Sequence, residues 1–389
     1  MAEITRRSFL QKSGQAAVAL GLAAMAVGGA AQPAKAPAPT AGEKEGSVRR
    51  TKAGGSSEKK ALSVPMEVEY KPAWLTWVTA TAGCLRALGI TCDQVDVAGY
   101  SGYAFLINVG EGMCPSGPTA FDWGLLLPGV TALGRSALVF RGAHCCCELN
   151  QERTSAYKKR VREEMRAAYD LVATEIESGR PCVLWGTYVP EFGIAVGVQN
   201  DSYLVKTWKP YIKEPEPPIP FDKLTNPSGS YVLAFPTAVE VAREQADREA
   251  LNHAVTMLNY RTSSPQYGAG QDAYDKWIAC LDASKAEPHG NSYNAHCWAE
   301  ARRFARDFLS RVAARNEAVA KPLGQAVVAY SQAADALGKV ARLFPFPHSA
   351  KKVNDPEARA AAIEALRAAK PADARAAAAL TEAAAAWPR

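Results

Sequence analysis

The feature that most limits the fold of this chain is a change in hydrophobic pattern near residue 235. Before it, short apolar runs typical of strands alternate with amphipathic segments typical of helices. After it, apolar side chains recur at helical spacing. This order predicts an α+β domain over residues 62–235, an all-helical domain over 236–345 and an Ala-rich helical tail over 346–389.

The α+β region contains a succession of strands with recognisable turns. The strands predicted from apolar runs are Ala137–Phe140, Cys182–Gly186, Gly193–Val198 and Tyr203–Thr207. Gln199–Asp201 has the composition of a hairpin turn between the last two strands. Two helices are also predicted, Trp74–Leu88 and Glu152–Gly179, and Cys84 is placed early in the first of them.

The region after Pro236 is predicted to begin with a helix from Thr237 to Tyr260. Thr237 and Glu240 have the spacing of a capping box, which satisfies the first backbone N–H groups of a helix. Three further helices are expected from spacing alone: Gln271–Leu281, Asn294–Val312 and Ala318–Leu343. The tail after Pro356 has few large side chains and is expected to pack only lightly.

The N-terminus has the form of an export signal. Thr5–Lys12 contains a pair of arginines followed by Phe-Leu, and a weakly apolar Gly/Ala-rich run follows at Ala16–Ala31. This arrangement resembles a twin-arginine signal, here residues 1–36, with a flexible linker over 37–61. It implies the twin-arginine export machinery as a partner, a periplasmic location and no stable membrane span after cleavage. The alternative is an uncleaved N-terminal anchor.

The formal charge of +6 is confined to the N-terminus. Residues 1–60 carry ten basic and four acidic side chains, and the rest of the chain carries 35 of each sign. A neutral body lacks the basic surface that binds nucleic acid, so no nucleic-acid partner is expected.

The nine cysteines do not form the spacing pattern of a small disulfide-rich domain, because their number is odd and three are contiguous. His144 and Cys145–Cys147 are candidate ligands for a soft metal ion. Neighbouring side chains on a strand point to opposite faces, so three in a row do not converge on one ion. Packing in the core, or at a strand end, is the alternative role for these cysteines.

A longer succession of motifs indicates a family. Cys84 is followed about a hundred residues later by Gly179–Gly186, then Pro190–Gly197 and Asp201–Thr207. This order resembles the C39-like branch of the papain-like proteins, and within it the N-terminal domain of the butirosin-biosynthesis acyltransferase type. Gly99–Phe105 and the helical stretch Tyr267–Trp277 are similar to segments of the same family. The resemblance covers about residues 65 to 310 and implies a papain-like fold.

The chain departs from that family at the catalytic positions. The family places a thiol at the start of a buried helix and a base on a facing strand. By the resemblance Cys84 takes the place of the nucleophile, but Glu191 stands where the histidine base belongs, with Gly197 correctly spaced after it. The orienting Asp or Asn position falls near Thr207, and Val78 replaces the usual Gln. A carboxylate beside a thiol raises the pKa of that thiol. The usual thiolate–imidazolium pair cannot form with this strand residue, because Glu191 has no imidazole.

A block with loop composition, Cys114–Trp123, completes the candidate site. If a pocket is present, we expect it to be lined by Cys84, Glu191, Cys114, Ser116, Asp122 and Trp123. Helices of the second domain would cap one side of it.

Three functions remain open from the sequence. The first is a degenerate cysteine peptidase-like or acyltransferase-like domain that binds a peptide or small metabolite without converting it. The second is an active cysteine-dependent hydrolase or acyltransferase with Cys84 as nucleophile. The third is a metal-binding protein that uses His144 and Cys145–Cys147.

No cofactor is expected. Gly268–Ala273 matches the pattern G-x-G-x-x-A, but the Ser-Ser-Pro-Gln that precedes it is not typical of the strand that a dinucleotide site requires.

Overall fold

The computed structural model describes residues 61–387. The predicted export signal, residues 1–36, lies outside this part of the chain. So does the predicted linker, residues 37–61, apart from its last residue.

A seven-stranded antiparallel sheet forms the first half of the molecule. Its strands follow the order β3-β8-β4-β5-β6-β7, and β1 pairs with β5. The strands are β1 (Leu62–Ser63), β3 (Leu138–Arg141), β4 (Cys182–Trp185), β5 (Phe192–Gln199), β6 (Ser202–Lys206), β7 (Ile219–Pro220) and β8 (Tyr231–Ala234). Positive φ angles at Asn200 and Asp201 form the tight turn between β5 and β6, as the sequence predicted.

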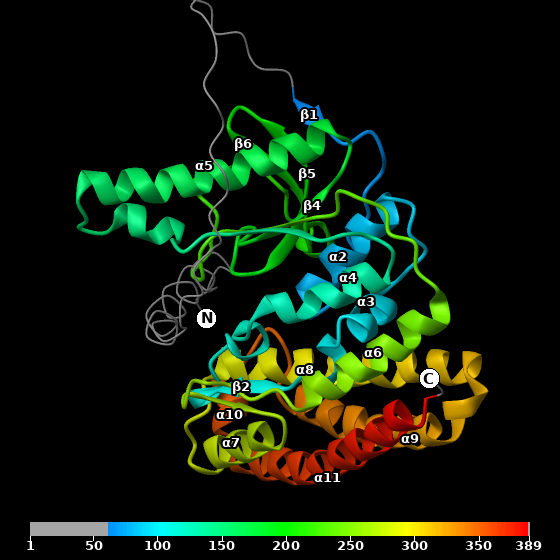
Figure 1. Cartoon of the computed structure of the whole chain (residues 1–389). Coiled ribbons are helices and arrows are strands. Elements are labelled where there is room, and N and C mark those ends of the chain that lie inside the picture. Colours follow the sequence, from blue (N-terminus) through cyan, green and yellow to red (C-terminus); the bar gives the residue numbers. More distant parts are fainter. Residues whose placement is uncertain (1–60, 388–389) are drawn as a thin grey trace, which may run out of the picture.

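Helices cover both faces of this sheet. The long helix α5 (Ser155–Glu177) lies on one face, where Val161, Met165 and Val172 pack against the strands. On the other face α2 (Thr76–Ala87) lies against β5 (Figure 1). Gly83 permits this close approach, because a Cβ there would come within 2.4 Å of Ile194 Cδ1.

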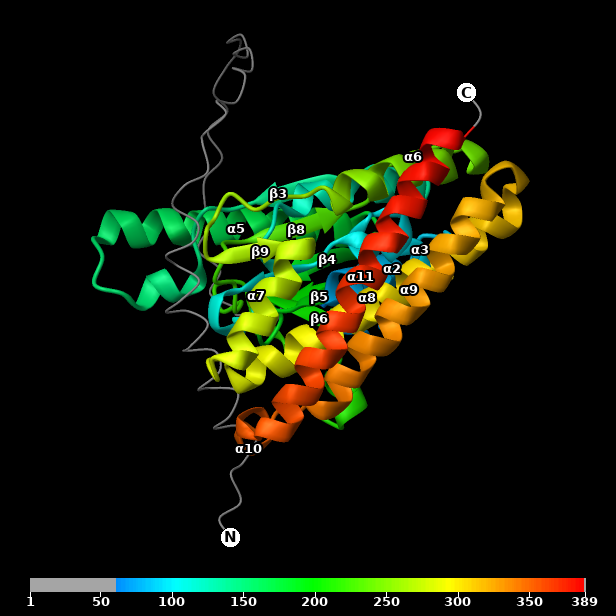
Figure 2. The same ribbon diagram turned by 90° about the horizontal axis from the view of Figure 1, so that it is seen from below.

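The second half is built of helices stacked beyond α2. Its elements are α6 (Arg243–Leu258), α7 (Gln271–Asp282), α8 (Pro288–Arg315), α9 (Glu317–Leu343), α10 (Ala350–Asn354) and α11 (Pro356–Ala386). The three longest, α8, α9 and α11, run side by side as rods (Figure 2). Two shorter helices, α3 (Gln94–Tyr100) and α4 (Leu127–Ala132), lie between these rods and the sheet (Figure 1).

The two halves are joined by more than the connecting chain. Strand β2 (Asn108–Gly110) pairs antiparallel with β9 (Tyr267–Ala269), so a segment of the first half completes a small sheet with a segment of the second. Buried side chains of α2 and α3 also belong to one continuous apolar cluster with those of α8, α9 and α11. The sheet ends close to the predicted boundary at residue 235, yet the core continues across it.

The mixed α+β class and the helical character of the second half are confirmed. The capping box at Thr237 and Glu240 is wrong, since α6 begins only at Arg243. The backbone of this segment is used elsewhere: Ser136 N–H donates to Thr237 O, and Val239 N–H donates to Gly134 O. Pairing with residues 134–136 therefore takes precedence over the local capping signal.

The expectation of a lightly packed tail is also wrong. Helix α11 places Ala362, Leu366, Ala369 and Leu380 completely out of contact with solvent. Small alanine side chains let α11 approach α9 closely, so a helix with few large residues still buries one full face.

Within residues 61–387, none of the helices combines the length and apolar character that a bilayer crossing requires.

Candidate functional site

The start of α2 meets the start of β5, and this contact brings Thr76 and Glu191 together. Thr76 is the first residue of α2, and its hydroxyl donates a hydrogen bond to the Glu191 carboxylate. The same hydroxyl oxygen accepts the Phe192 backbone N–H at 3.2 Å. The Thr76 hydroxyl thus donates one hydrogen bond and accepts another, both with residues at the start of the strand that faces the helix.

Helix α8 contributes the other members of this site. Tyr293, Cys297 and Glu300 recur at spacings of four and three, which places them on one face of the helix. The Tyr293 hydroxyl hydrogen-bonds Glu191, and Glu300 Oε2 accepts the Leu75 N–H at 2.9 Å. We call Thr76, Glu191, Tyr293, Cys297 and Glu300 the helix-start cluster, because they surround the N-terminus of α2.

Two carboxyl groups of the helix-start cluster have strongly perturbed acidity. Desolvation raises the pKa of Glu191 to about 7, although Thr76 and Tyr293 donate to it and some of its side chain remains accessible. Desolvation likewise raises the pKa of Glu300 to about 7, against the opposing effect of the Leu75 N–H. The positive end of the α2 dipole favours both carboxylates, but burial has the larger effect.

The thiol in this cluster belongs to Cys297. Burial raises its pKa well above the usual value, and the nearby Glu191 and Glu300 raise it further. A thiol in such surroundings stays protonated at neutral pH and is a poor nucleophile.

Cys84 does not lie where the sequence placed it. The helix starts at Thr76, so Cys84 is in its last turn, at the end whose dipole disfavours a thiolate. The side chain is fully buried, and desolvation followed by the nearby Cys182 raises its pKa. No hydrogen bond joins Cys84 to Glu191 in the described chain. The prediction that this thiol lies early in the helix is wrong, because α2 runs only from Thr76 to Ala87 and Cys84 is the fourth residue from its end.

The four other predicted pocket residues fall into different surroundings. Trp123 packs edge-on against Trp185 and Phe192, each at 4.9 Å between ring centroids, within the apolar core. Asp122 forms an exposed ion pair with Arg141 at 2.6 Å.

Cys114 and Ser116 lie instead beside the small β2–β9 sheet. Cys114 Sγ is 2.9 Å from Ser116 Oγ, which is 2.7 Å from the Tyr267 hydroxyl. These two side chains interact with Tyr267 and not with Glu191, so the structure separates what the sequence analysis had grouped.

The candidate metal ligands do not converge. Cys145 and Cys147 are joined by a disulfide, Cys146 Sγ contacts the Leu224 carbonyl, and His144 Nδ1 lies 2.8 Å from Glu164. Disulfide sulfurs are not thiolate ligands. Among residues 61–387 there is no group of three or more His, Cys, Asp or Glu side chains placed to hold an ion.

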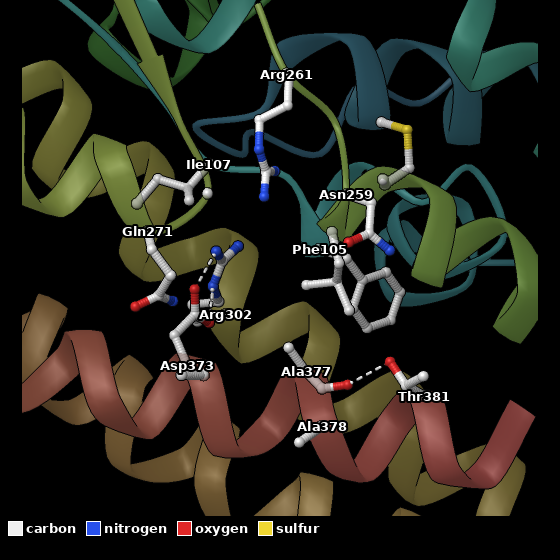
Figure 3. A pocket seen from close by; sticks show the side chains of 14 residues that line it. Phe105, Ile107, Asn259, Arg261, Gln271, Arg302, Asp373, Ala377, Ala378 and Thr381 are labelled. Atoms are coloured by element: carbon white, nitrogen blue, oxygen red, sulfur yellow. Dashed lines mark hydrogen bonds and ion pairs between the residues drawn. The ribbon is translucent and has the colours of Figure 1, made fainter.

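A cavity of about 250 Å³ lies on the opposite side of α8 (Figure 3). It is open to solvent on one side and is lined by the end of α6, the start of α7, α8, α11 and the segment 105–107. Its lining residues are Phe105, Ile107, Met257, Leu258, Asn259, Arg261, Gly270, Gln271, Arg302, Asp373, Ala374, Ala377, Ala378 and Thr381.

A buried ion pair forms the floor of this cavity. Arg302 is completely buried, and its guanidinium binds Asp373 through two parallel hydrogen bonds of 2.7 and 2.8 Å. Two further N–H groups donate to the carbonyls of Ala104 and Leu106. The pair is bidentate and largely satisfied, which is the geometry that makes a buried charge tolerable.

Sequence reasoning missed Thr76, the α8 residues and the cavity. Some signal was present: Arg302 falls in the apolar stripe of α8 that includes Trp298 and Leu309, and a cation inside such a stripe indicates a buried partner. The partner, Asp373, is 71 residues away and carries no local signature.

Neither a scan against protein-family models nor a search of curated proteins finds a match for this chain.

Proposed function

We propose that this chain is an exported, papain-like protein that has lost thiol catalysis and binds a peptide or a small metabolite. A papain-like enzyme needs an ionisable thiol at the N-terminus of its core helix and a base on the strand opposite. Here the helix begins at Thr76, and the strand opposite begins next to Glu191. The hydrogen bond between these two residues is the observation that carries the proposal.

The bonding of Thr76 argues against turnover at this position. A hydroxyl is a weak nucleophile until a base removes its proton. Thr76 is almost fully buried and its oxygen already accepts the Phe192 N–H. Glu191 and Thr76 therefore act as a structural connection between α2 and β5.

The cysteine-dependent alternative requires Cys84 to ionise. Its complete burial and its place in the last turn of α2 both oppose this. The metal-binding alternative loses two of its ligands to the Cys145–Cys147 disulfide.

That disulfide supports the proposed export, because disulfides persist in oxidising compartments such as the periplasm. Replacing Arg6 and Arg7 by Lys is expected to retain the protein in the cytoplasm, as measured by cell fractionation. Unchanged periplasmic recovery would contradict a twin-arginine route.

Thiol labelling tests the loss of catalysis. Native protein is treated with iodoacetamide across pH 6 to 10, and each cysteine is followed by mass spectrometry. Cys84 and Cys297 are expected to react only after unfolding, whereas the more accessible Cys114 provides an internal positive control. Rapid labelling of Cys84 with a midpoint below about 8.5 would overturn the proposal in favour of an active enzyme.

A second experiment tests the papain-like geometry itself. The double variant Thr76→Cys, Glu191→His rebuilds a thiol and an imidazole at the two contacting positions. If the geometry is papain-like, this thiol should alkylate faster at pH 6 than the thiol of the matched control Thr76→Cys, Glu191→Gln. Equal rates would mean that the two positions do not form such a pair.

A further inference from the structure

The cavity between α6, α7, α8 and α11 exists because of the small side chains of α11. Ala374, Ala377, Ala378 and Thr381 lie on one face of that helix and line one wall. Opposite them stand large apolar side chains, including Phe105, Ile107 and Met257. The volume is somewhat below the roughly 300–1,000 Å³ of drug-sized sites, and thus suits a smaller molecule.

Among the described residues, the cavity lining carries one uncompensated positive charge, on the exposed residue Arg261. Its ionised lining residues are Arg261, Arg302 and Asp373, and the last two neutralise each other. Arg261 forms no ion pair within residues 61–387; its one hydrogen bond goes to the adjacent Tyr260 carbonyl. In Figure 3 the Arg261 side chain extends toward the ion pair, with Gln271 and Asn259 on either side of it.

The start of α7 adds hydrogen-bond donors at the same place. The backbone N–H groups of Gln271 and Asp272 have no acceptor in the described protein, as is usual for the first turn of a helix. Gly270 precedes them with φ +60°, and a Cβ there would lie 3.4 Å from Arg261 Nη1. The positive φ accounts for glycine at this position, and the distance shows that the Arg261 guanidinium lies beside the start of α7.

We propose that this cavity binds a small organic carboxylate with an apolar body. The carboxylate pairs with Arg261, since guanidinium and carboxylate match as planar two-point partners. The apolar body lies against Phe105, Ile107 and Met257. The inference goes beyond the proposed function, because it does not depend on the helix-start cluster or on a papain-like relationship.

Isothermal titration calorimetry on the full-length protein tests the charge requirement. The probes are benzoate and hexanoate, each compared with its neutral amide, and inorganic phosphate as an anion without an apolar body. At least one acid is expected to bind with a dissociation constant of about 1 mM or lower, and its amide at least about tenfold more weakly. No binding of either acid, or equal binding of acid and amide, would overturn the proposal. Phosphate binding as tight as that of the acids would overturn the assignment to a carboxylate with an apolar body.

Two pairs of variants locate the bound acid. Arg261→Gln should weaken binding by about tenfold or more, whereas Arg367→Gln, an exposed position on α11 outside the cavity, should leave it unchanged. Ala377→Phe should abolish binding by filling the cavity, in contrast to Ala361→Phe elsewhere on α11. Thermal melts of all four variants establish that they are folded. Binding that survives in both Arg261→Gln and Ala377→Phe would place the acid elsewhere and refute the inference.

Discussion

The two sides of helix α8 bury charge in opposite ways. Glu300 faces the start of α2, in a cluster where carboxyl groups and a thiol accumulate without a bidentate cation. Arg302, two residues later, faces α11 and is matched by Asp373 with near-ideal geometry. One helix thus holds a poorly compensated acidic cluster and a compensated ion pair.

The acidic cluster and the ion pair are therefore expected to differ in how strongly their contributions to stability depend on pH. Arg302 keeps its charge over the accessible pH range, because the desolvation that lowers its already high pKa is outweighed by the nearby aspartate, which raises it. The carboxyl groups of the helix-start cluster have pKa values of about 7, so they change charge near neutrality. Mutations on the two sides of α8 should therefore change the free energy of unfolding by different amounts and with different pH dependence.

The largest effect is expected from Asp373→Ala. Removing one partner leaves the Arg302 charge buried and uncompensated, which costs about 3–5 kcal/mol of unfolding free energy. Urea unfolding at pH 7 measures this loss. Asp275→Ala, which breaks the more exposed pair with Lys370, is the control and should cost less than about 1 kcal/mol. Similar losses in the two variants would show that Arg302 is not a compensated buried charge.

The second prediction concerns pH. In the folded protein the pKa values of Glu191 and Glu300 are raised from 4.5 to about 7. The native state therefore holds these protons more tightly than the unfolded state, and their contribution to stability is complete below pH 4.5 and lost as pH rises through about 7. Urea unfolding at a series of pH values should show a decrease on the order of a few kcal/mol over that window.

The double variant Glu191→Gln, Glu300→Gln should flatten this dependence, because neither amide titrates. Glu364→Gln, at an exposed position on α11, serves as the matched control and should retain the decrease. A wild-type profile that rises between pH 5 and 7 would contradict the assigned direction.

A smaller effect is expected at Thr76. Thr76→Val keeps the shape but removes the hydroxyl that connects Glu191 and the Phe192 N–H. The loss should be about 1–3 kcal/mol, the usual consequence of leaving buried polar groups without a partner. Thr76→Ser retains the hydroxyl and should recover most of the stability in the same unfolding assay. Equal stability of the Val variant and wild type would show that the contact contributes nothing.

The smallest effect is expected from Asp122→Ala, at a position that the sequence analysis placed in the pocket. Its ion pair with Arg141 is exposed, and such pairs contribute about 0–1 kcal/mol. Thermal unfolding at low and high salt should show a small difference that salt reduces further. A loss as large as that of Asp373→Ala would assign Asp122 a role that its exposure does not explain.

The elements of the fold were largely predictable because they repeat locally. The strands predicted at 182–186, 193–198 and 203–207 have periodic apolar residues, and the structure places their ends within one residue of the prediction. The long helices are also present, although α6 and α8 start six residues from the predicted positions. The wrong predictions arose where backbone pairing with a distant segment overrode the local sequence pattern. Residues 237–240 have a good capping pattern, yet their backbone pairs with residues 134–136.

The site was harder to predict because its members are dispersed along the chain. Thr76, Glu191 and Tyr293 lie on three elements separated by about a hundred residues each, and no spacing rule connects them. The sequence analysis singled out Glu191, and the structure places it in the helix-start cluster with a raised pKa. Cys84 was selected instead of Thr76 because a thiol is a candidate nucleophile, whereas a threonine is common at the start of a helix and attracts no functional interpretation.

The pairing of Arg302 with Asp373 also bears on the timing of folding. The two residues are 71 positions apart, and at about 5–20 residues per second the ribosome needs several seconds to synthesise that interval. During this time α8 can form, but its buried arginine has no counter-charge, and the face that α11 covers remains open. Helix α8 is therefore expected to reach a stable arrangement only after the last helix has been synthesised, whereas the sheet and α5 share an apolar cluster of their own. The helical half should be the last part of the protein to reach its native structure.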